Sequence, residues 1–212
     1  MTRIELSNWN RREIYAFFKG VSQPYYALSF PIDVTAVYDY KRAHGISFYY
    51  MMVYLCTKAI NSIENFRYTE RNGQIFLLDE RRPSATDACP ETGLFKMVTF
   101  PMQPDAVSFC HAAREISAAQ TNLLNASDEG DDLIFFSSLP DLPTITYTNP
   151  HNYADPHEAE HNIPSVNWGQ YVESNGRKTL NLTMEINHRF VDGHHAALFY
   201  KRLQAEIEGL EM

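Results

Sequence analysis

Cysteine and glycine are scarce in this sequence, and it has no long apolar run. The three cysteines, at positions 56, 89 and 110, form no CxxC pair, and their odd count argues against a disulfide framework. Only nine of the 212 residues are glycine, which excludes a collagenous or Gly-rich chain. The densest apolar run, residues 48–56, is too short to span a bilayer, and the first residues lack the apolar core of a signal peptide. We therefore expect a cytoplasmic protein with no membrane contact.

Basic residues are also in the minority. Lys and Arg number 18 against 26 Asp and Glu, whereas proteins that bind nucleic acid or anionic membranes carry a basic face. We expect neither of these partners. Aromatic residues, in contrast, reach 13%, which indicates thick packing layers or apolar surfaces buried against another subunit. With 44% apolar residues and no linker, residues 1–212 are expected to form a single domain.

Helical and strand patterns interleave along the chain. Two Asn-Gly pairs, at 72–73 and 175–176, are strong hairpin signals, and Thr35 and Ser47 suit the N-caps of helices. Residues 149–162 have no period and are expected to form a long loop. The expected helices cover residues 9–18, 35–44, 48–63, 105–124 and 194–210, and the expected strands cover residues 25–34, 66–71, 74–78, 94–100, 132–138, 165–173 and 178–188. This order predicts one α/β domain with a mixed sheet.

His188 ends the last expected strand. Its side chain is in phase with Met184 and Ile186 on the apolar face, so a fixed imidazole there can meet a ligand and exchange a proton near neutral pH. The alternative is a core histidine that donates to a carbonyl. Asp192 and Gly193 follow in the sequence; glycine permits a tight turn, and a buried carboxylate needs a partner. The combination favours a functional histidine.

The residues from His188 to Gly193, HRFVDG, have the form of the HxxxDG motif of coenzyme A-dependent acyltransferases. Three further segments occur in the order found in chloramphenicol acetyltransferases: NWNRRE at 8–13, FSSLP at 136–140 and PSVNWGQY at 164–171. The sequence therefore resembles the chloramphenicol acetyltransferase family over nearly its whole length. The resemblance implies an α/β two-layer sandwich, in which a mixed β-sheet is packed by helices. It also implies an acetyl-CoA-dependent O-acetyltransferase that acts on chloramphenicol or a related small hydroxyl compound.

The same resemblance implies catalytic roles. His188 would be the general base that deprotonates the acceptor hydroxyl, which then attacks the thioester carbonyl of acetyl-CoA directly. Ser137 would donate a hydrogen bond to the resulting oxyanion. Asp192 would pair with Arg11 and hold the loop below His188, whose tautomer would be set by its own backbone carbonyl. Acetyl-CoA would be a co-substrate, with no permanently bound cofactor.

Members of the family are trimers with each site between two subunits. The resemblance thus implies a homotrimer in which His188 and the acceptor pocket come from different chains. Five positions depart from the family pattern. Asn187 stands where a second histidine is more typical, and Asp141 where a tryptophan near the coenzyme is usual. Phe135 stands where Asn is frequent, Phe18 where a tyrosine helps to bind chloramphenicol, and Tyr26 where Phe is common. The positions that match the acceptor pocket are Phe17, Phe18, Tyr26 and Phe135, and those that match the coenzyme site are Asn167 and Tyr171.

Other functions remain open from the sequence. The acyltransferase core of a 2-oxo acid dehydrogenase complex shares the HxxxDG motif, but it normally follows a lipoyl domain and a linker, whose absence from these residues disfavours it. A non-catalytic trimer that only binds ligands is the alternative outside enzymes, and the joint presence of the expected site residues argues against it. Metal binding is disfavoured because the candidate ligands show no standard ligand spacing. The candidates near the motif are His188, Asp192, His194 and His195, and those in the loop are His151, His157, Glu158, Glu160 and His161.

Overall fold

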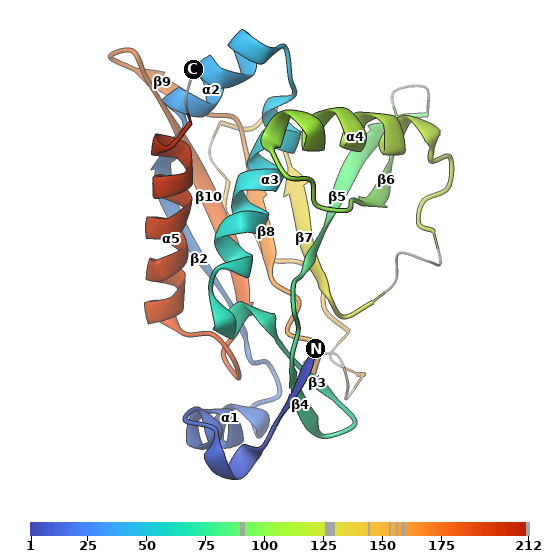
Figure 1. The fold of residues 1–212 in the computed structure, drawn as a ribbon, viewed down its shortest axis with the longest axis vertical. Helices are drawn as coiled ribbons and strands as arrows, with labels where there is room; N and C mark the ends of the chain where they lie inside the picture. The colour runs from blue at the N-terminus through green and yellow to red at the C-terminus, as the bar shows by residue number, and fades with distance from the viewer. Residues whose placement is uncertain are drawn as a thin grey trace.

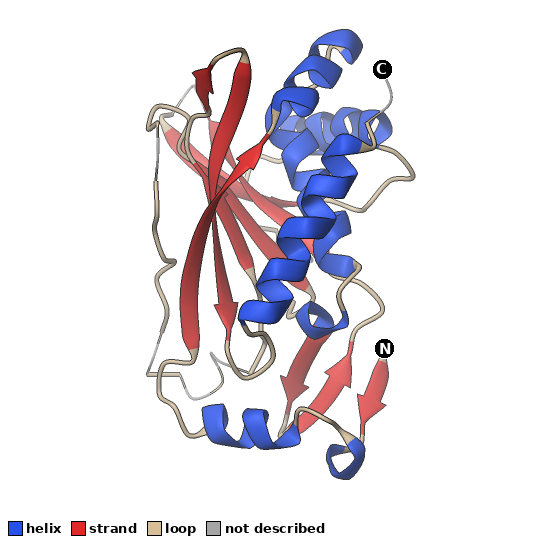
Figure 2. Ribbon diagram, turned by 90° about the vertical axis from the view of Figure 1, so that its left-hand side faces the viewer, coloured by secondary structure: helices blue, strands red, loops and turns tan. Residues whose placement is uncertain are grey.

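A mixed β-sheet forms the centre of the chain, and helices pack against one of its two faces, as the computed structural model shows (Figure 1, Figure 2). The structure describes residues 1–89, 92–125, 130–143, 145–152, 154–155, 157 and 160–210. The strand order is β2-β10-β8-β7-β5-β6, with β9 paired to one end of β10. The pairs β5–β7 and β7–β8 are parallel and the other pairs are antiparallel. The strands are β2 Tyr25–Asp33, β5 Arg82–Cys89, β6 Leu94–Thr99, β7 Leu133–Ser138, β8 Ser165–Trp168, β9 Val172–Ser174 and β10 Arg177–Asn187.

A second, smaller sheet lies beyond one end of the main sheet. It has the order β1-β4-β3, and α1 lies beside it at the lower end of Figure 1. Its strands are β1 Thr2–Ile4, β3 Tyr68–Arg71 and β4 Gln74–Leu77. The α-helices are α1 Arg12–Lys19, α2 Thr35–His44, α3 Phe48–Asn61, α4 Ala106–Ala119 and α5 Gly193–Glu208, and the short 3₁₀ helices are η1 Leu6–Asn8 and η2 Glu64–Arg67.

Helix α3 is apolar nearly all round, and the structure buries it on several sides. It packs against α4 and α5 as well as the main sheet, and Met51, Met52 and Cys56 have no exposed surface. The helix begins where the hydroxyl of Ser47 accepts a hydrogen bond from the backbone N–H of Tyr50, at 3.4 Å. The core of the fold therefore lies between this helix and the sheet. None of the helices in the described part of the chain is long and apolar enough to cross a membrane.

The two faces of β10 differ as its alternating sequence predicts, but both are buried. Leu180, Leu182, Met184 and Ile186 are fully buried in the hydrophobic core. Thr183, Glu185 and Asn187 alternate with them and are also nearly fully buried, at 0%, 3% and 1% exposure. The reason is a covering segment, residues 145–152, which crosses this polar face. Its Ile145 carbonyl accepts from Asn181 at 2.6 Å and from Thr183 at 3.3 Å, and its Asn149 N–H donates to Glu185 at 2.9 Å.

The mixed α/β sandwich expected from the sequence is confirmed, as are both Asn-Gly hairpins. Thr35 is the first residue of α2 and not its N-cap, because the carboxylate of Asp33 accepts hydrogen bonds from its N–H and its hydroxyl. The helix expected over 105–124 ends at Ala119, since the Gln120 side chain instead donates to Met97 O and Asn122 O. The sequence pattern predicts neither β1 nor β5. For β5 the reason is that it begins with an Arg-Pro pair and has no apolar alternation. The described residues of 149–162 contain no helix or strand.

Candidate active site

The turn that follows β10 is fixed by one buried arginine. Arg11, just before α1, is 5% exposed and makes three contacts with this turn. Its Nη2 donates to the carbonyl of His188 at 3.1 Å, its Nε to the carbonyl of Arg189 at 3.0 Å, and its Nη1 to Asp192 Oδ2 at 2.8 Å. A planar guanidinium can bind three acceptors in a fixed geometry. The contact expected between Arg11 and Asp192 is therefore observed, and it extends to the backbone of His188.

Asp192 is also the N-cap residue of α5. Its carboxylate accepts a hydrogen bond from the N–H of His194, and its own N–H donates to Nδ1 of His195 at 3.2 Å, which completes a capping box. Partial burial raises the pKa of Asp192, but the hydrogen bond from Arg11 and the nearby charges outweigh it and leave the pKa below its ordinary value. Burial lowers the pKa of His195, and its Nδ1 also lies 2.9 Å from Asp192 Oδ1. Asp192 is thus held as a carboxylate.

The imidazole of His188 is held between two aromatic rings. The ring of Phe18 stacks on it with centroids 4.0 Å apart, and the ring of Tyr26 lies 4.7 Å away at a tilt of 35°. The backbone N–H of His188 donates to the carbonyl of Pro24 at 2.8 Å. Its Nδ1 is buried and has no hydrogen-bond partner among the described residues, so the expected bond to its own carbonyl is not formed. That carbonyl instead accepts from Arg11.

Ser137 lies in a separate cavity of about 230 Å³. The hydroxyl of Thr86 donates to Ser137 Oγ at 3.0 Å, and the hydroxyl of Tyr147 donates to Asn167 Oδ1 at 2.7 Å. The pKa of Tyr147 is raised, because burial outweighs a hydrogen bond with Ser137 that lowers it. The phenol beside the serine is therefore neutral. The cavity is lined by Ser84, Thr86, Met97, Phe135, Phe136, Ser137, Asn149, Pro150 and Asn167.

His188 and Ser137 are far apart within one chain. Ser137 is paired with Asn167 on β8, and Asn167 is paired with Thr183 on β10, so these three residues form one row across the sheet. His188 lies five positions beyond Thr183 along the chain, or about 17 Å at the rise of a strand, and Ser137 lies two strands away, or about 10 Å. The separation is therefore roughly 19 Å. A base and an oxyanion donor that serve one carbonyl must each lie within about 3 Å of the reacting atoms.

The predicted substrate-binding residues divide between these two places. Phe18 and Tyr26 pack on His188, whereas Phe135 and Asn167 line the cavity with Ser137. Phe17 contacts Phe18 but is 71% exposed. Tyr171 lies elsewhere, in a cluster of aromatic and cationic side chains, with its ring 5.5 Å from Tyr38 and 5.9 Å from Lys178 Nζ.

Sequence reasoning missed Thr86 and Tyr147. Thr86 belongs to β5, which carries no strand pattern, and Tyr147 belongs to the covering segment, which has no periodicity. No local signal marks either residue, because each meets the site only through tertiary contacts. In the described ranges, no group of three or more His, Cys, Asp or Glu side chains is placed to hold a metal ion. Glu158 lies outside the described residues.

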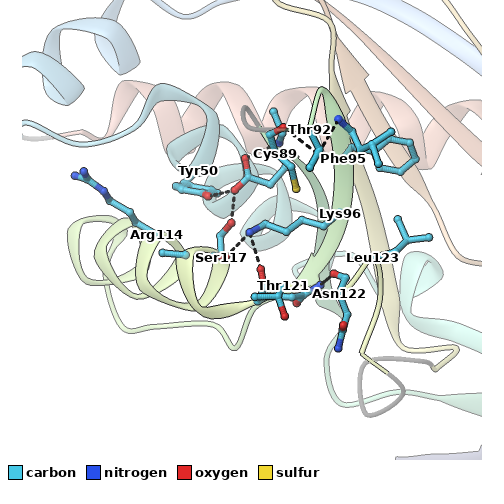
Figure 3. A pocket seen from close by; sticks show the side chains of 15 residues that line it. Tyr50, Cys89, Thr92, Phe95, Lys96, Arg114, Ser117, Thr121, Asn122 and Leu123 are labelled. Carbon is cyan, nitrogen blue, oxygen red and sulfur yellow. Dashed lines mark hydrogen bonds between the residues drawn. The ribbon is translucent and has the colours of Figure 1, made fainter.

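A larger cavity, of about 850 Å³, contains none of the predicted site residues (Figure 3). It lies between the end of α4 and the β5–β6 hairpin. Figure 3 shows the side chains of Tyr50, Ser117 and Lys96 on the wall of this cavity. Tyr50 donates to Asp87 at 2.5 Å, Ser117 also donates to Asp87, and Lys96 donates to the Gln120 carbonyl at 2.9 Å. Asp87 and the Gln120 carbonyl are therefore paired with groups of the same cavity.

Comparison with known proteins agrees with the fold. The chain is 25% identical over 209 residues to chloramphenicol acetyltransferase 2 of Escherichia coli, with 99% of this chain and 98% of the relative covered. A solved structure of a chloramphenicol acetyltransferase superposes with a TM-score of 0.86 at 28% identity, covering 96% of this chain and 98% of the other. The cubic core of the pyruvate dehydrogenase multienzyme complex gives a TM-score of 0.67 at 17% identity, covering 93% and 88%, which is a likeness of fold alone.

The family model described as chloramphenicol acetyltransferase matches residues 1–204. This range includes α1 with Arg11, the cavity around Ser137 and the fixed turn at His188. The match therefore covers both halves of the candidate site and nearly the whole sheet. The chain belongs to the chloramphenicol acetyltransferase family, a family of acetyltransferases.

Proposed function

We propose that the chain transfers the acetyl group of acetyl-CoA to a hydroxyl of a small acceptor, chloramphenicol or a related compound, and acts as a single acyltransferase domain. The observation that carries this proposal is the turn at 188–193, which Arg11 fixes at three points. A general base must keep a constant position relative to the proton it removes. A histidine whose backbone and ring are both held in place, within a chain of this family, meets that requirement.

In the proposed mechanism, His188 removes the proton from the acceptor hydroxyl, whose oxygen attacks the thioester carbonyl. The Ser137 hydroxyl, which accepts from Thr86, turns its own hydrogen toward the developing oxyanion. Collapse of the tetrahedral intermediate breaks the carbon–sulfur bond and releases CoA, and His188 returns its proton to the thiolate. No covalent enzyme intermediate is needed.

The proposed active site is made by two copies of the chain. His188 and Ser137 are roughly 19 Å apart in one chain by their strand register, so a single copy cannot present both to one carbonyl. We propose that His188 of one copy meets the Ser137 cavity of the next copy in a closed homotrimer. Phe17, which contacts Phe18 beside His188, is an apolar side chain with 71% exposure and fits such an interface.

The acceptor remains a small hydroxyl compound in this proposal. The cavity beside Ser137 combines apolar walls from Met97, Phe135 and Pro150 with a buried hydroxyl, Ser84 Oγ, that has no partner among the described residues. An acceptor that brings a polar group to Ser84 would satisfy it. The 2-oxo acid dehydrogenase alternative has in its favour the shared HxxxDG motif and a likeness of fold at 17% identity.

A screen of acceptors tests the proposed function directly. The protein is incubated with acetyl-CoA and one small alcohol at a time, chloramphenicol included, and free CoA is measured with a thiol reagent. We expect CoA release that depends on the acceptor and yields one equivalent of acetylated product. CoA release with dihydrolipoamide alone would favour the 2-oxo acid dehydrogenase alternative, and binding without release would favour a non-catalytic trimer.

A further inference from the structure

Glu70 is a buried carboxylate that the proposed mechanism does not use. It lies in β3 of the small sheet and has 0% exposure. Its backbone N–H donates to the carbonyl of Glu160 at 2.8 Å. A buried ionised carboxylate is stable only beside groups of opposite charge, because removal from water is costly. The groups around Glu70 therefore indicate what it holds.

Two cations from different segments reach the carboxylate of Glu70. Lys19, the last residue of α1, donates from Nζ to Oε1 at 2.7 Å and to the Tyr15 hydroxyl at 3.0 Å. The hydrogen bond with Glu70 raises the pKa of Lys19. Arg189 approaches the other oxygen, with Nη1 3.8 Å from Oε2. The side chain of Arg189 is 9% exposed, and its Nη2 donates to the carbonyl of Lys19 at 3.3 Å.

Both segments that carry these cations also hold His188. Arg189 directly follows His188 in the fixed turn. Lys19 directly follows Phe18, whose ring stacks on the His188 imidazole. Glu70 therefore connects the backbone next to the histidine with the end of the helix that packs against its ring.

We propose that Glu70 is a positioning residue for His188, which it orients by fixing Arg189 and Lys19. Glu70 belongs to the small sheet and touches neither the His188 ring nor the Ser137 cavity among the described residues. The inference rests on the proposed acetyl transfer. A displacement of about 1 Å in a catalytic group costs on the order of 10²-fold in rate. Loss of Glu70 should therefore lower kcat and leave the KM values nearly unchanged.

The first test compares Glu70→Gln with a matched control, Asp131→Asn. Asp131 is also a largely buried carboxylate, with a side chain 11% exposed, and it binds Arg71, the residue next to Glu70. Both variants lose one charge of an ion pair and should lose stability in thermal unfolding. We expect kcat to fall roughly 10- to 100-fold only in Glu70→Gln, with both KM values within about threefold of wild type. Equal kcat losses in the two variants, or none in Glu70→Gln, would overturn the proposal.

A second variant covers the case in which Glu70→Gln does not fold. Arg189→Lys keeps a positive charge beside Glu70 but loses the planar fork that reaches the Lys19 carbonyl. We expect this variant to fold with a kcat at least about fivefold lower than that of wild type, because only the position of the turn changes. A wild-type kcat in folded Arg189→Lys would refute the role assigned to Glu70 and Arg189.

The position of His188 can also be measured without turnover. Diethyl pyrocarbonate acylates accessible imidazoles, and peptide mass spectrometry gives the rate at His188 alone. We expect this rate to change severalfold in Glu70→Gln and to stay at the wild-type value in Asp131→Asn. If wild type transfers no acetyl group to any acceptor, the proposed function fails, and this labelling still decides whether Glu70 positions the histidine. Equal labelling in all three proteins would refute the positioning role.

Discussion

Arg11 and Asp192 are 181 positions apart in the sequence, and their side chains meet at 2.8 Å. The arginine is 5% exposed and the aspartate side chain 27% exposed. Such a pair leaves an uncompensated charge when one partner is removed. The pair also closes the turn that carries His188, so its stability and the activity of the protein should be linked.

The first prediction concerns this pair. Arg11→Met and Asp192→Asn should each lower the free energy of unfolding by about 3 kcal/mol, the lower end of the range for buried pairs because Asp192 is partly exposed. The double variant should lose less than the sum of the two, since neither charge remains unpaired. Urea unfolding of the four proteins measures the coupling. Additive losses would mean that the two side chains do not interact in solution.

The second prediction concerns acid pH. The pKa of folded Asp192 lies below its ordinary value near 3.9, so its contribution to stability is complete above about pH 4 and is lost as the pH falls through the folded pKa. The stability advantage of wild type over Asp192→Asn should thus be constant between pH 7 and 5 and shrink toward pH 3. Asn keeps the N-cap, so this variant isolates the charge. Asp39→Asn, at an exposed position of α2, serves as the control. An advantage independent of pH would contradict the ion pair.

The third prediction concerns the general base. His188→Ala should reduce kcat by at least about 10²- to 10⁴-fold and leave the fold and acetyl-CoA binding intact. His111→Ala is the control, because His111 lies at an exposed position of α4. This variant loses a histidine outside the candidate site and should have wild-type kinetics. Steady-state kinetics and circular dichroism measure both effects. Near-normal turnover in His188→Ala would exclude His188 as the base.

The fourth prediction concerns the oxyanion. Ser137→Ala should lower kcat by roughly 10²-fold with little change in either KM, because the hydrogen bond strengthens only as charge develops. Ser138→Ala, one residue later on the same strand, should change kcat less than about threefold. A change in KM alone for Ser137→Ala would show that this serine binds the ground state.

The fifth prediction concerns the shared site. Copies with His188→Ala and copies with Ser137→Ala are unfolded, mixed in equal amounts and refolded. If each site takes His188 from one copy and Ser137 from its neighbour, one site in four receives both intact residues, and about a quarter of wild-type activity should return. Sedimentation should give about three chain masses. A mixture no more active than its inactive parents would mean that both residues serve from the same copy.

Much of the fold follows from local sequence signals. The two Asn-Gly turns, the N-cap at Ser47 and the alternation in β10 depend on neighbouring residues, so they can be read without a structure. β5 could not be predicted in this way. It has no apolar alternation, and it is a strand because β6 and β7 supply hydrogen-bond partners on both sides.

The candidate site also combines residues that the sequence predicts with residues that only the fold brings together. The HxxxDG motif is continuous in the sequence and, with the resemblance, it predicts roles for His188, Asp192, Arg11 and Ser137. Of these predictions the contact between Arg11 and Asp192 is observed. The placement of the substrate-binding residues was less complete: Phe18 and Tyr26 pack on His188 in the same chain, whereas the resemblance had assigned them to a pocket facing it from another chain. That arrangement depends on how α1 packs against β2.

The sequence by itself determined the class of fold and the family, and it predicts His188 as the reactive histidine, because periodicity, turn residues and a short motif are properties of neighbouring positions. Only the tertiary structure decided which distant side chains hold that histidine. Arg11 binds the turn from a position 177 residues before His188, and Glu70 reaches Arg189 from the small sheet. Tyr147 meets Asn167 through a segment without pattern. These contacts join buried charged or polar groups to partners that lie close only once the sheet, the covering segment and α1 have packed, and an unpartnered group in the same places would be costly to bury.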